Sequence, residues 1–132
     1  MLEKIFSLKK NSTINLIPVD IGGIVIKIPV ADISGGADGP TVVITAGMDG
    51  DEYAGIEAAY RINDEMSVRE FAGRLIVIPI VNIPGFEAEC SYCPVDGQFP
   101  KNFFPGDSNG SATERIVSWL VQNYLFRYAT NP

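Results

Sequence analysis

A short apolar stretch that runs into a glycine turn and then into acidic residues constrains this chain most. Residues 41–46, Thr-Val-Val-Ile-Thr-Ala, are mostly β-branched and apolar, which predicts a strand covered on both faces. Gly47 and Gly50 permit a sharp turn after this strand. Asp51 and Glu52 then open a predicted helix, where free backbone N–H groups and the helix dipole favour negative charge. These carboxylates are therefore either helix caps or part of a site at the end of the strand.

The rest of the chain predicts an α/β fold in a single domain, residues 1–132. The order strand, helix, strand over residues 41–81 predicts parallel central strands in a mixed sheet with flanking helices. In such sheets, sites form at the carboxyl ends of the strands. The predicted elements are an antiparallel hairpin over 13–19 and 23–31 with a turn at 20–23, a loop at 34–40, strands at 41–46 and 74–81, and helices at 52–66 and 111–128.

The two predicted helices differ in how much of their surface is apolar. In the helix over 52–66, the apolar side chains lie near one face and residues 63–65, Asn-Asp-Glu, near another, so one side packs on the sheet. The helix over 111–128 begins with a capping box of Ser111 and Glu114. Because most of its later residues are apolar, this helix is predicted to be buried on most sides.

Residues 82–110 are rich in proline and glycine, and their aromatic side chains predict a packed loop rather than a flexible one. Within this loop, Cys90 and Cys93 form a C-x-x-C pair. A structural zinc site would need a second pair, and a redox motif would lie where a strand enters a helix. We predict reduced thiols without a role, with a local disulfide and a metal site as the alternatives.

Residues 39–59 read G-P-T-V-V-I-T-A-G-M-D-G-D-E-Y-A-G-I-E-A-A. They resemble the metal-binding motif of the succinylglutamate desuccinylase/aspartoacylase family of zinc-dependent deacylases, relatives of the zinc carboxypeptidases. That motif reads close to G-P-T-[VL]-x-[IL]-T-A-G-x-H-G-D-E-Y-x-G-I-E-A-A, with its His and first Glu as zinc ligands. Asp49 stands at the histidine position and Glu52 at the glutamate position. The resemblance implies a zinc-carboxypeptidase-like fold and a metal site at Asp49 and Glu52.

Two further blocks resemble the same family in the same order. Residues 72–86 are similar to its second buried strand and the V-N-P-x-[AG]-F segment that follows. Residues 96–107 resemble D-G-x-x-x-N-R-x-F-P-G-D, whose Asn and Arg hold the substrate carboxylate. Lys101 stands at the Asn position and Asn102 at the Arg position. The resemblance, which covers about residues 14–128, thus implies substrate binding by Lys101 and Asn102 and a small N-acyl amino acid as the ligand.

The donor set departs from what a zinc site requires. A catalytic zinc needs three protein ligands and an open position for water, but this sequence contains no histidine. Asp49 can replace a histidine ligand, since carboxylate oxygen also binds zinc. Oxygen-only sites prefer Mg²⁺, Ca²⁺ or Mn²⁺, and Asp49 with Glu52 alone would bind any of these weakly. Lys101 is either a contact for a substrate carboxylate, without the bidentate fork of an arginine, or a solvated loop residue.

Charge and hydropathy argue against several classes of protein. The net charge of −6 argues against a surface for nucleic acid or for an anionic membrane. No apolar run reaches the ~18 residues of a membrane span. Residues 1–4, Met-Leu-Glu-Lys, lack the long apolar core of a signal peptide. We therefore expect a cytoplasmic protein.

The family's fold continues beyond the last predicted helix, into a strand that ends in D-L-H and delivers the third zinc ligand. The sequence ends at Pro132, before such a strand. We therefore expect either the amino-terminal portion of a longer deacylase-like catalytic domain or a partner chain that covers the apolar surface. A homo-oligomer is predicted, through the open sheet edge or through the helix face made by Ile116, Leu120, Tyr124 and Tyr128.

Two classes of function stay open from the residues alone. The first is a metal-dependent amidohydrolase that attacks an N-acyl amino acid with metal-bound hydroxide. The second is a non-catalytic relative or fragment that keeps the fold and serves as a ligand-binding or oligomerising module. The absent histidines and the changed residues at 101 and 102 predict that this chain is inactive, and no catalytic residue is assigned.

Overall fold

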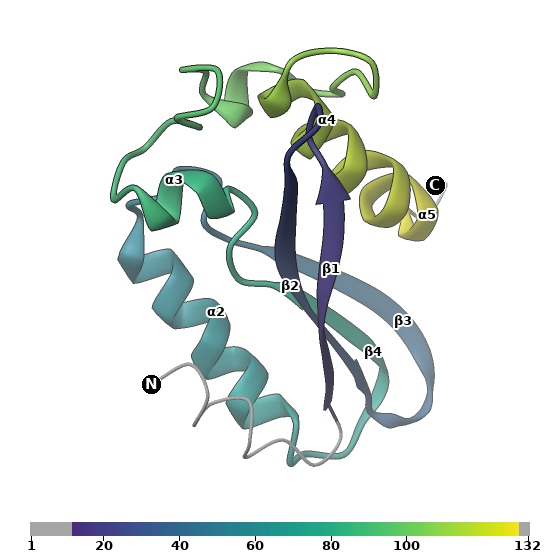
Figure 1. The fold of residues 1–132 in the computed structure, drawn as a ribbon. Coiled ribbons are helices and arrows are strands. Elements are labelled where there is room, and N and C mark those ends of the chain that lie inside the picture. The colour runs from purple at the N-terminus through teal and green to yellow at the C-terminus, as the bar shows by residue number, and fades with distance from the viewer. Residues whose placement is uncertain (1–11, 130–132) are drawn as a thin grey trace.

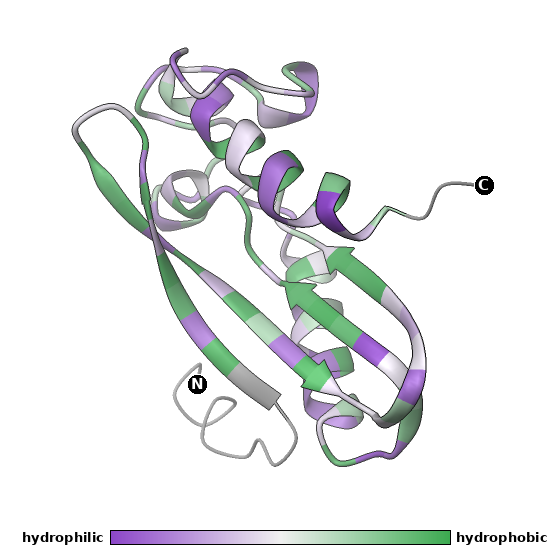
Figure 2. Ribbon diagram, turned by 90° about the vertical axis from the view of Figure 1, so that its right-hand side faces the viewer, coloured by the Kyte–Doolittle hydropathy of each residue, from purple (hydrophilic) through white to green (hydrophobic). Residues whose placement is uncertain are grey.

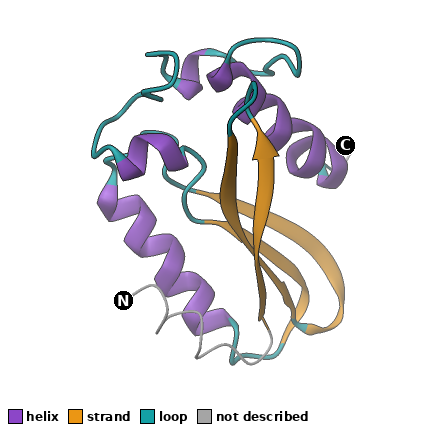
Figure 3. Ribbon diagram, viewed as in Figure 1, coloured by secondary structure: helices purple, strands orange, loops and turns teal. Residues whose placement is uncertain are grey.

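The computed structural model describes residues 12–129, which form a four-stranded mixed sheet with helices packed on it (Figure 1). The predicted α/β fold is confirmed, and Figure 3 shows the strands between the helices. The strands are β1 (Ser12–Asp20), β2 (Val25–Ser34), β3 (Gly36–Thr45) and β4 (Phe71–Ile78), in the order β1-β2-β4-β3. The helices are α2 (Tyr53–Met66), α3 (Ile83–Glu87), the 3-10 turn η1 (Pro100–Asn102), α4 (Ala112–Leu120), the π-helical segment η2 (Val121–Leu125) and α5 (Phe126–Tyr128).

The predicted hairpin is confirmed, because β1 and β2 pair antiparallel with Ser12 opposite Ile33. Its turn depends on Asp20, whose Oδ1 accepts hydrogen bonds from the backbone N–H groups of Gly22 (2.9 Å) and Gly23 (2.8 Å). Both glycines have positive φ, which few other residues adopt at low cost.

The predicted parallel pair is also confirmed: β3 and β4 run parallel with Val43 opposite Ile76, and α2 connects them. The interpretation of residues 41–46 as covered on both faces is wrong. Among the described strands, β3 lies at the edge of the sheet, and the side chain of Val42 is half exposed. The strand buried on both faces is β4, where residues 75–78, Leu-Ile-Val-Ile, are all buried.

The predicted loop at 34–40 is wrong as well, since β3 begins at Gly36 and reaches Thr41 through an irregularity in its register. Glycine makes this possible where β3 and β4 come close. A Cβ atom on Gly39 would lie 2.7 Å from the carbonyl carbon of Ala72, and one on Gly73 would overlap the carbonyl oxygen of Pro40. The glycines that indicate a loop in the sequence therefore serve the close approach of two strands.

The two faces of the sheet bury two different apolar clusters. The hydrophobic residues along the strands are green in Figure 2. Side chains alternate between the faces along a strand, so neighbouring residues of β2 and β4 belong to opposite clusters. Each large apolar side chain that is fully buried contributes about 1.5–3 kcal/mol to stability. One cluster joins Ile28, Val30, Ile76 and Ile78 to Ile116 and Leu120 of α4, and the other joins Ala31, Ile33, Leu75 and Val77 to Ala59 of α2.

Helix α2 matches the predicted 52–66 within one residue, but two details differ. Its N-cap residue, Glu52, makes no side-chain hydrogen bond to the helix, so the prediction that this carboxylate caps the helix is wrong. Asn63, predicted on the polar face, is buried, and its carbonyl oxygen accepts a hydrogen bond from the hydroxyl of Ser67.

Helix α4 confirms the predicted capping box at Ser111 and Glu114. The prediction of one regular helix to 128, buried on most sides, holds only for its first part. After Leu120 the chain continues as the π-helical segment η2, and Phe126 beyond it is 62% exposed. Ile116 and Leu120, predicted for an oligomer interface, lie instead in the core of the chain itself.

Over residues 12–129, no helix combines the length and the hydropathy that crossing a membrane requires. The expectation about a signal peptide concerns residues 1–4, which lie outside the described residues.

Candidate functional site

The candidate site lies where β3 and β4 end. After β3, Gly47 turns the chain with φ +66° and Gly50 packs against the backbone of α3, and Asp49 lies between them. The backbone N–H of Gly50 donates to the carbonyl oxygen of Ser91 (3.2 Å), and that of Glu52 donates to the carbonyl oxygen of Asp49 (3.2 Å). The turn therefore fixes the backbone of Asp49 from both sides, and only 9% of this residue is exposed.

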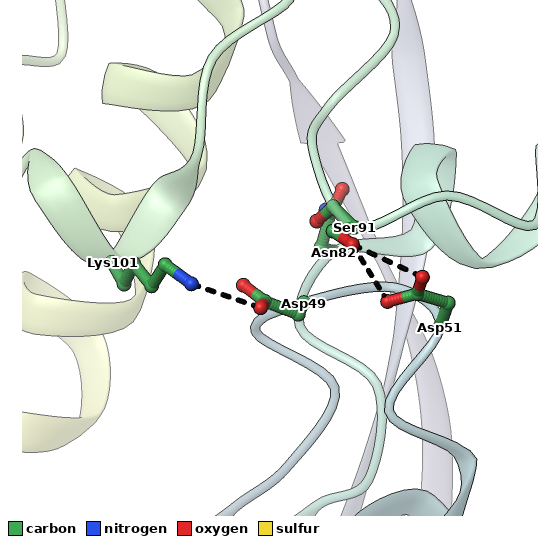
Figure 4. A network of polar contacts seen from close by, with 5 residues as sticks. All are labelled: Asp49, Asp51, Asn82, Ser91 and Lys101. Carbon is green, nitrogen blue, oxygen red and sulfur yellow. Dashed lines mark hydrogen bonds and ion pairs between the residues drawn. The ribbon is translucent and has the colours of Figure 1, made fainter.

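Asn82 follows β4 and ties the neighbouring segments together (Figure 4). Its Oδ1 accepts a hydrogen bond from the backbone N–H of Gly85 (3.0 Å), which caps α3, and its Nδ2 donates to the carbonyl oxygen of Ser91 (3.1 Å). The hydroxyl of Ser91 donates to the carboxylate of Asp51, with both oxygens at 3.0 Å. Asp51 is thus held at this edge by Ser91 rather than serving as a helix cap.

Asp49 meets Lys101, which comes from the other side of the site on the turn η1 (Figure 4). Nζ of Lys101 lies 3.0 Å from Oδ2 of Asp49. The second oxygen, Oδ1, is buried and has no hydrogen-bond partner among residues 12–129. The lysine side chain is 55% exposed and the aspartate side chain 12% exposed, so solvent reaches this ion pair from the lysine side.

The loop that carries Lys101 is anchored at two places. Pro100 is buried, and the Lys101 ammonium group lies 5.3 Å from the centre of the Phe99 ring. Asp96 accepts hydrogen bonds from the backbone N–H and the hydroxyl of Thr113, both at 2.7 Å, which joins the loop to the start of α4. Lys101 therefore projects from an ordered turn, and its side chain is both solvated and paired with Asp49.

Of the four residues predicted from the sequence, the structure brings Asp49 and Lys101 into contact. Glu52 and Asn102 are exposed, and within residues 12–129 neither side chain forms a hydrogen bond or an ion pair with those two. Asp51, predicted as a helix cap or as part of a site, lies at the same edge, as do Asn82 and Ser91, which were not predicted as site residues. The position of Asn82, directly after the strand predicted at 74–81, is the signal that could have found it.

The donors present do not fit a zinc ion. Among residues 12–129, no group of three or more His, Cys, Asp or Glu side chains lies close enough to hold a metal ion. Asp49 offers one oxygen that is already paired with an ammonium group and one that is buried. Zinc sites with three protein ligands need more donors than this edge supplies.

The two cysteines are not joined to each other. Cys93 is fully buried, and burial raises the pKa of its thiol, although hydrogen bonds from the Val95 backbone and Thr113 act in the opposite direction. Because the thiolate is the reactive form, Cys93 is in an unreactive setting.

Residues 38–129 match the family model for the succinylglutamate desuccinylase/aspartoacylase catalytic domain. The chain belongs to this family. A curated relative, the N-alpha-acetyl-L-2,4-diaminobutyric acid deacetylase of Halomonas elongata, is 36% identical over 97 residues, which are 74% of this chain and 28% of the relative.

Solved structures of the family have the same fold. The succinylglutamate desuccinylase/aspartoacylase of Rhodobacter sphaeroides superposes with a TM-score of 0.81 at 27% identity, over 92% of this chain and 39% of the other. The product-bound ectoine utilization protein EutE (DoeB) of Ruegeria pomeroyi gives a TM-score of 0.77 at 28% identity, with the same coverage of 92% and 39%. This chain therefore spans between 28% and 39% of the length of these three relatives.

Proposed function

We propose that this chain is a non-hydrolytic member of the desuccinylase/aspartoacylase family, whose residues keep the fold but do not support metal-dependent amide hydrolysis. The observation that carries the proposal is the contact of the Lys101 ammonium group with Asp49. In the resemblance drawn from the sequence, Asp49 is a metal-site residue. Here its reachable oxygen is already neutralised by a side chain of the same protein.

Hydrolysis of an amide by this kind of enzyme needs a cation that lowers the pKa of bound water and polarises the carbonyl group. This chain contributes no histidine, one carboxylate that is paired and one carboxylate, Glu52, that is exposed. Catalytic groups act as a unit, so the loss of some of them removes most of the rate enhancement.

The substrate contacts are also changed. An arginine holds a carboxylate through two parallel hydrogen bonds, which the neutral side chain of Asn102 cannot form. Lys101 carries a positive charge, but Asp49 neutralises it, so little attraction is left for the carboxylate of an N-acyl amino acid. These two features support weak or absent binding of the substrate class that the resemblance implies.

Release of free amine from N-acetyl amino acids tests the proposal. The substrates are N-acetyl-2,4-diaminobutyrate, taken from the name of the Halomonas elongata relative, and N-acetylaspartate. We expect no release above the buffer rate, with or without added Zn²⁺ or Mn²⁺, while that relative, assayed in parallel, releases amine. Asp49→His is expected to stay inactive, because the other ligands and the arginine are still missing. Metal-dependent release by the unchanged chain that Glu52→Gln abolishes would contradict the proposal.

A further inference from the structure

We infer that the Lys101 ammonium group is the resident cation of this site and that it excludes a divalent metal ion from Asp49. The inference concerns the same residues as the proposed function and rests on it for the location of the site. Metal binding and turnover are separate measurements, so either statement can fail while the other stands.

The contact joins two motif positions at which this sequence carries a charge that the resembled motif lacks. Asp49 stands at the position of a neutral ligand and Lys101 at that of a neutral residue, while the neutral Asn102 stands at the position of the arginine. Asp49 and Lys101 are 52 positions apart in the chain, yet their charged atoms lie 3.0 Å apart. The carboxylate of Asp49 is largely buried, and a charge buried without a partner is costly. The ammonium group of Lys101 balances this charge.

The burial of Asp49 makes this balance necessary. Its side chain is only 12% exposed, and Oδ1 is buried with no hydrogen-bond partner in the described part of the chain. Oδ2 is therefore the atom at which a cation from solvent would arrive, and Nζ of Lys101 occupies that side. A metal ion bound to a carboxylate oxygen stands about 2.0–2.2 Å from it, so it would come within a few ångströms of the ammonium group. Two like charges at that separation repel strongly where solvent is partly excluded.

The ammonium group is held in place by its own turn. Pro100, buried at the start of η1, fixes the backbone before Lys101, and the backbone N–H of Phe103 donates to the carbonyl oxygen of Pro100 (3.1 Å). The face of the Phe99 ring lies 5.3 Å from Nζ, which adds a favourable interaction with the cation. The ammonium group of Lys101 thus takes the place beside Asp49 that a bound cation would otherwise take.

Titration with Mn²⁺, followed by amide signals in two-dimensional NMR spectra, tests the inference. Mn²⁺ broadens the signals of nearby residues, so it detects binding even at the ~10⁻⁴–10⁻³ M at which weak oxygen sites fill. In the unchanged protein, we expect the amide signals of residues 49–52 to broaden no more than those of other exposed acidic residues. In Lys101→Met, which removes the charge but keeps a long side chain, we expect selective broadening at 49–52.

Two controls locate the effect. Asp49→Asn combined with Lys101→Met should lose the selective broadening, because the carboxylate is gone. Lys27→Met removes an exposed lysine of β2 and should leave the titration as in the unchanged protein. The spectra themselves report whether each variant is folded, and Lys101→Gln is a second variant with the same expected gain.

Selective broadening at 49–52 in the unchanged protein would overturn the inference, as would its absence in folded Lys101→Met and Lys101→Gln. If neither variant folds, the combination with Asp49→Asn decides. Recovery of folding would support the inference, because it would show that the lysine compensates the charge of Asp49. Continued unfolding would overturn it, because Lys101 would then be needed for packing and not for that charge.

Discussion

Asp96 shows, at the scale of a single residue, how one carboxylate positions the loop that carries Lys101. Its two oxygens accept hydrogen bonds from the backbone and side chain of Thr113 and from the backbone of Gln98 (3.1 Å). Burial alone would raise the pKa of Asp96, but the hydrogen bonds from Thr113, Gln98 and Ser111 outweigh it and lower the pKa below the ordinary 3.8. The folded chain therefore favours the ionised form.

Asp96→Asn should lower the free energy of unfolding at neutral pH by about 1–3 kcal/mol, because hydrogen bonds to a charged group are lost. Since the folded pKa is lower than the unfolded one, the contribution of the charge is complete above about pH 4 and disappears as the pH falls through the folded pKa. Urea unfolding of both proteins at pH 7 and at pH 3 measures this. A difference that stays the same at both pH values would contradict the assignment.

The sequence predicts which residues surround the site better than it predicts how they pair. Asp49 lies at the end of β3, as the strand and glycine turn indicate, because the carboxyl end of a strand is a local property of the chain. The contact with Lys101 depends on how a loop folds back over a separation of 52 residues, which no local pattern determines. The resemblance to the family motif therefore implies a substrate contact for Lys101 and gives no sign of its contact with Asp49.

At the scale of elements, the turn after β3 is packed against α3 through Gly50. A Cβ atom at this position would overlap the backbone of Gly85 and Phe86 and lie 2.7 Å from the carbonyl oxygen of Cys90. All of these atoms belong to the backbone and cannot move aside as a side chain can. Only glycine allows the two segments to approach this closely.

Gly50→Ala is expected to destabilise the chain by about 1–3 kcal/mol, because the extra methyl group must push the turn away from α3. Gly55→Ala is the matched control, since a Cβ atom on this residue of α2 meets nothing within 4 Å. Replacing a helical glycine by alanine should stabilise the chain by about 0.4–1 kcal/mol. Thermal unfolding of the two variants compares them, and equal losses would contradict the packing described for the turn.

Elements with a strong periodic pattern were predicted well, and elements shaped by their neighbours were not. The hairpin, α2 and the capped start of α4 follow from local residues, and so does β4, although it begins and ends three residues before the predicted 74–81. The early start of β3 does not, because Gly36, Gly39 and Pro40 indicate a loop until the close contact with β4 is known. The π-helical segment Val121–Leu125 contains neither glycine nor proline, so nothing in the sequence marks the change that leaves Phe126 exposed.

At the scale of the whole molecule, the described sheet ends at β3 with an unpaired strand edge. Between Thr41 and Thr45 this edge has no proline and includes Val42, which is half exposed. Both edge strands contain a proline, which cannot donate a backbone hydrogen bond: Pro40 lies in the irregular part of β3, before this stretch, whereas Pro18 lies within the regularly paired part of β1. Open edges of this kind pair with other chains. The β3 edge is thus the better surface for association, while the predicted face at Ile116 and Leu120 is already buried.

We therefore predict a homo-oligomer at micromolar concentration that forms through β3. Val42→Lys places a charge on this edge, which disfavours strand pairing, and should shift the protein toward the monomer in sedimentation velocity. Leu16→Lys, on β1, is the matched control, because Leu16 is exposed to a similar degree, 54% against 50%, and should leave the distribution unchanged. A monomer at all micromolar concentrations, or an equal shift in both variants, would show that the β3 edge does not carry the association.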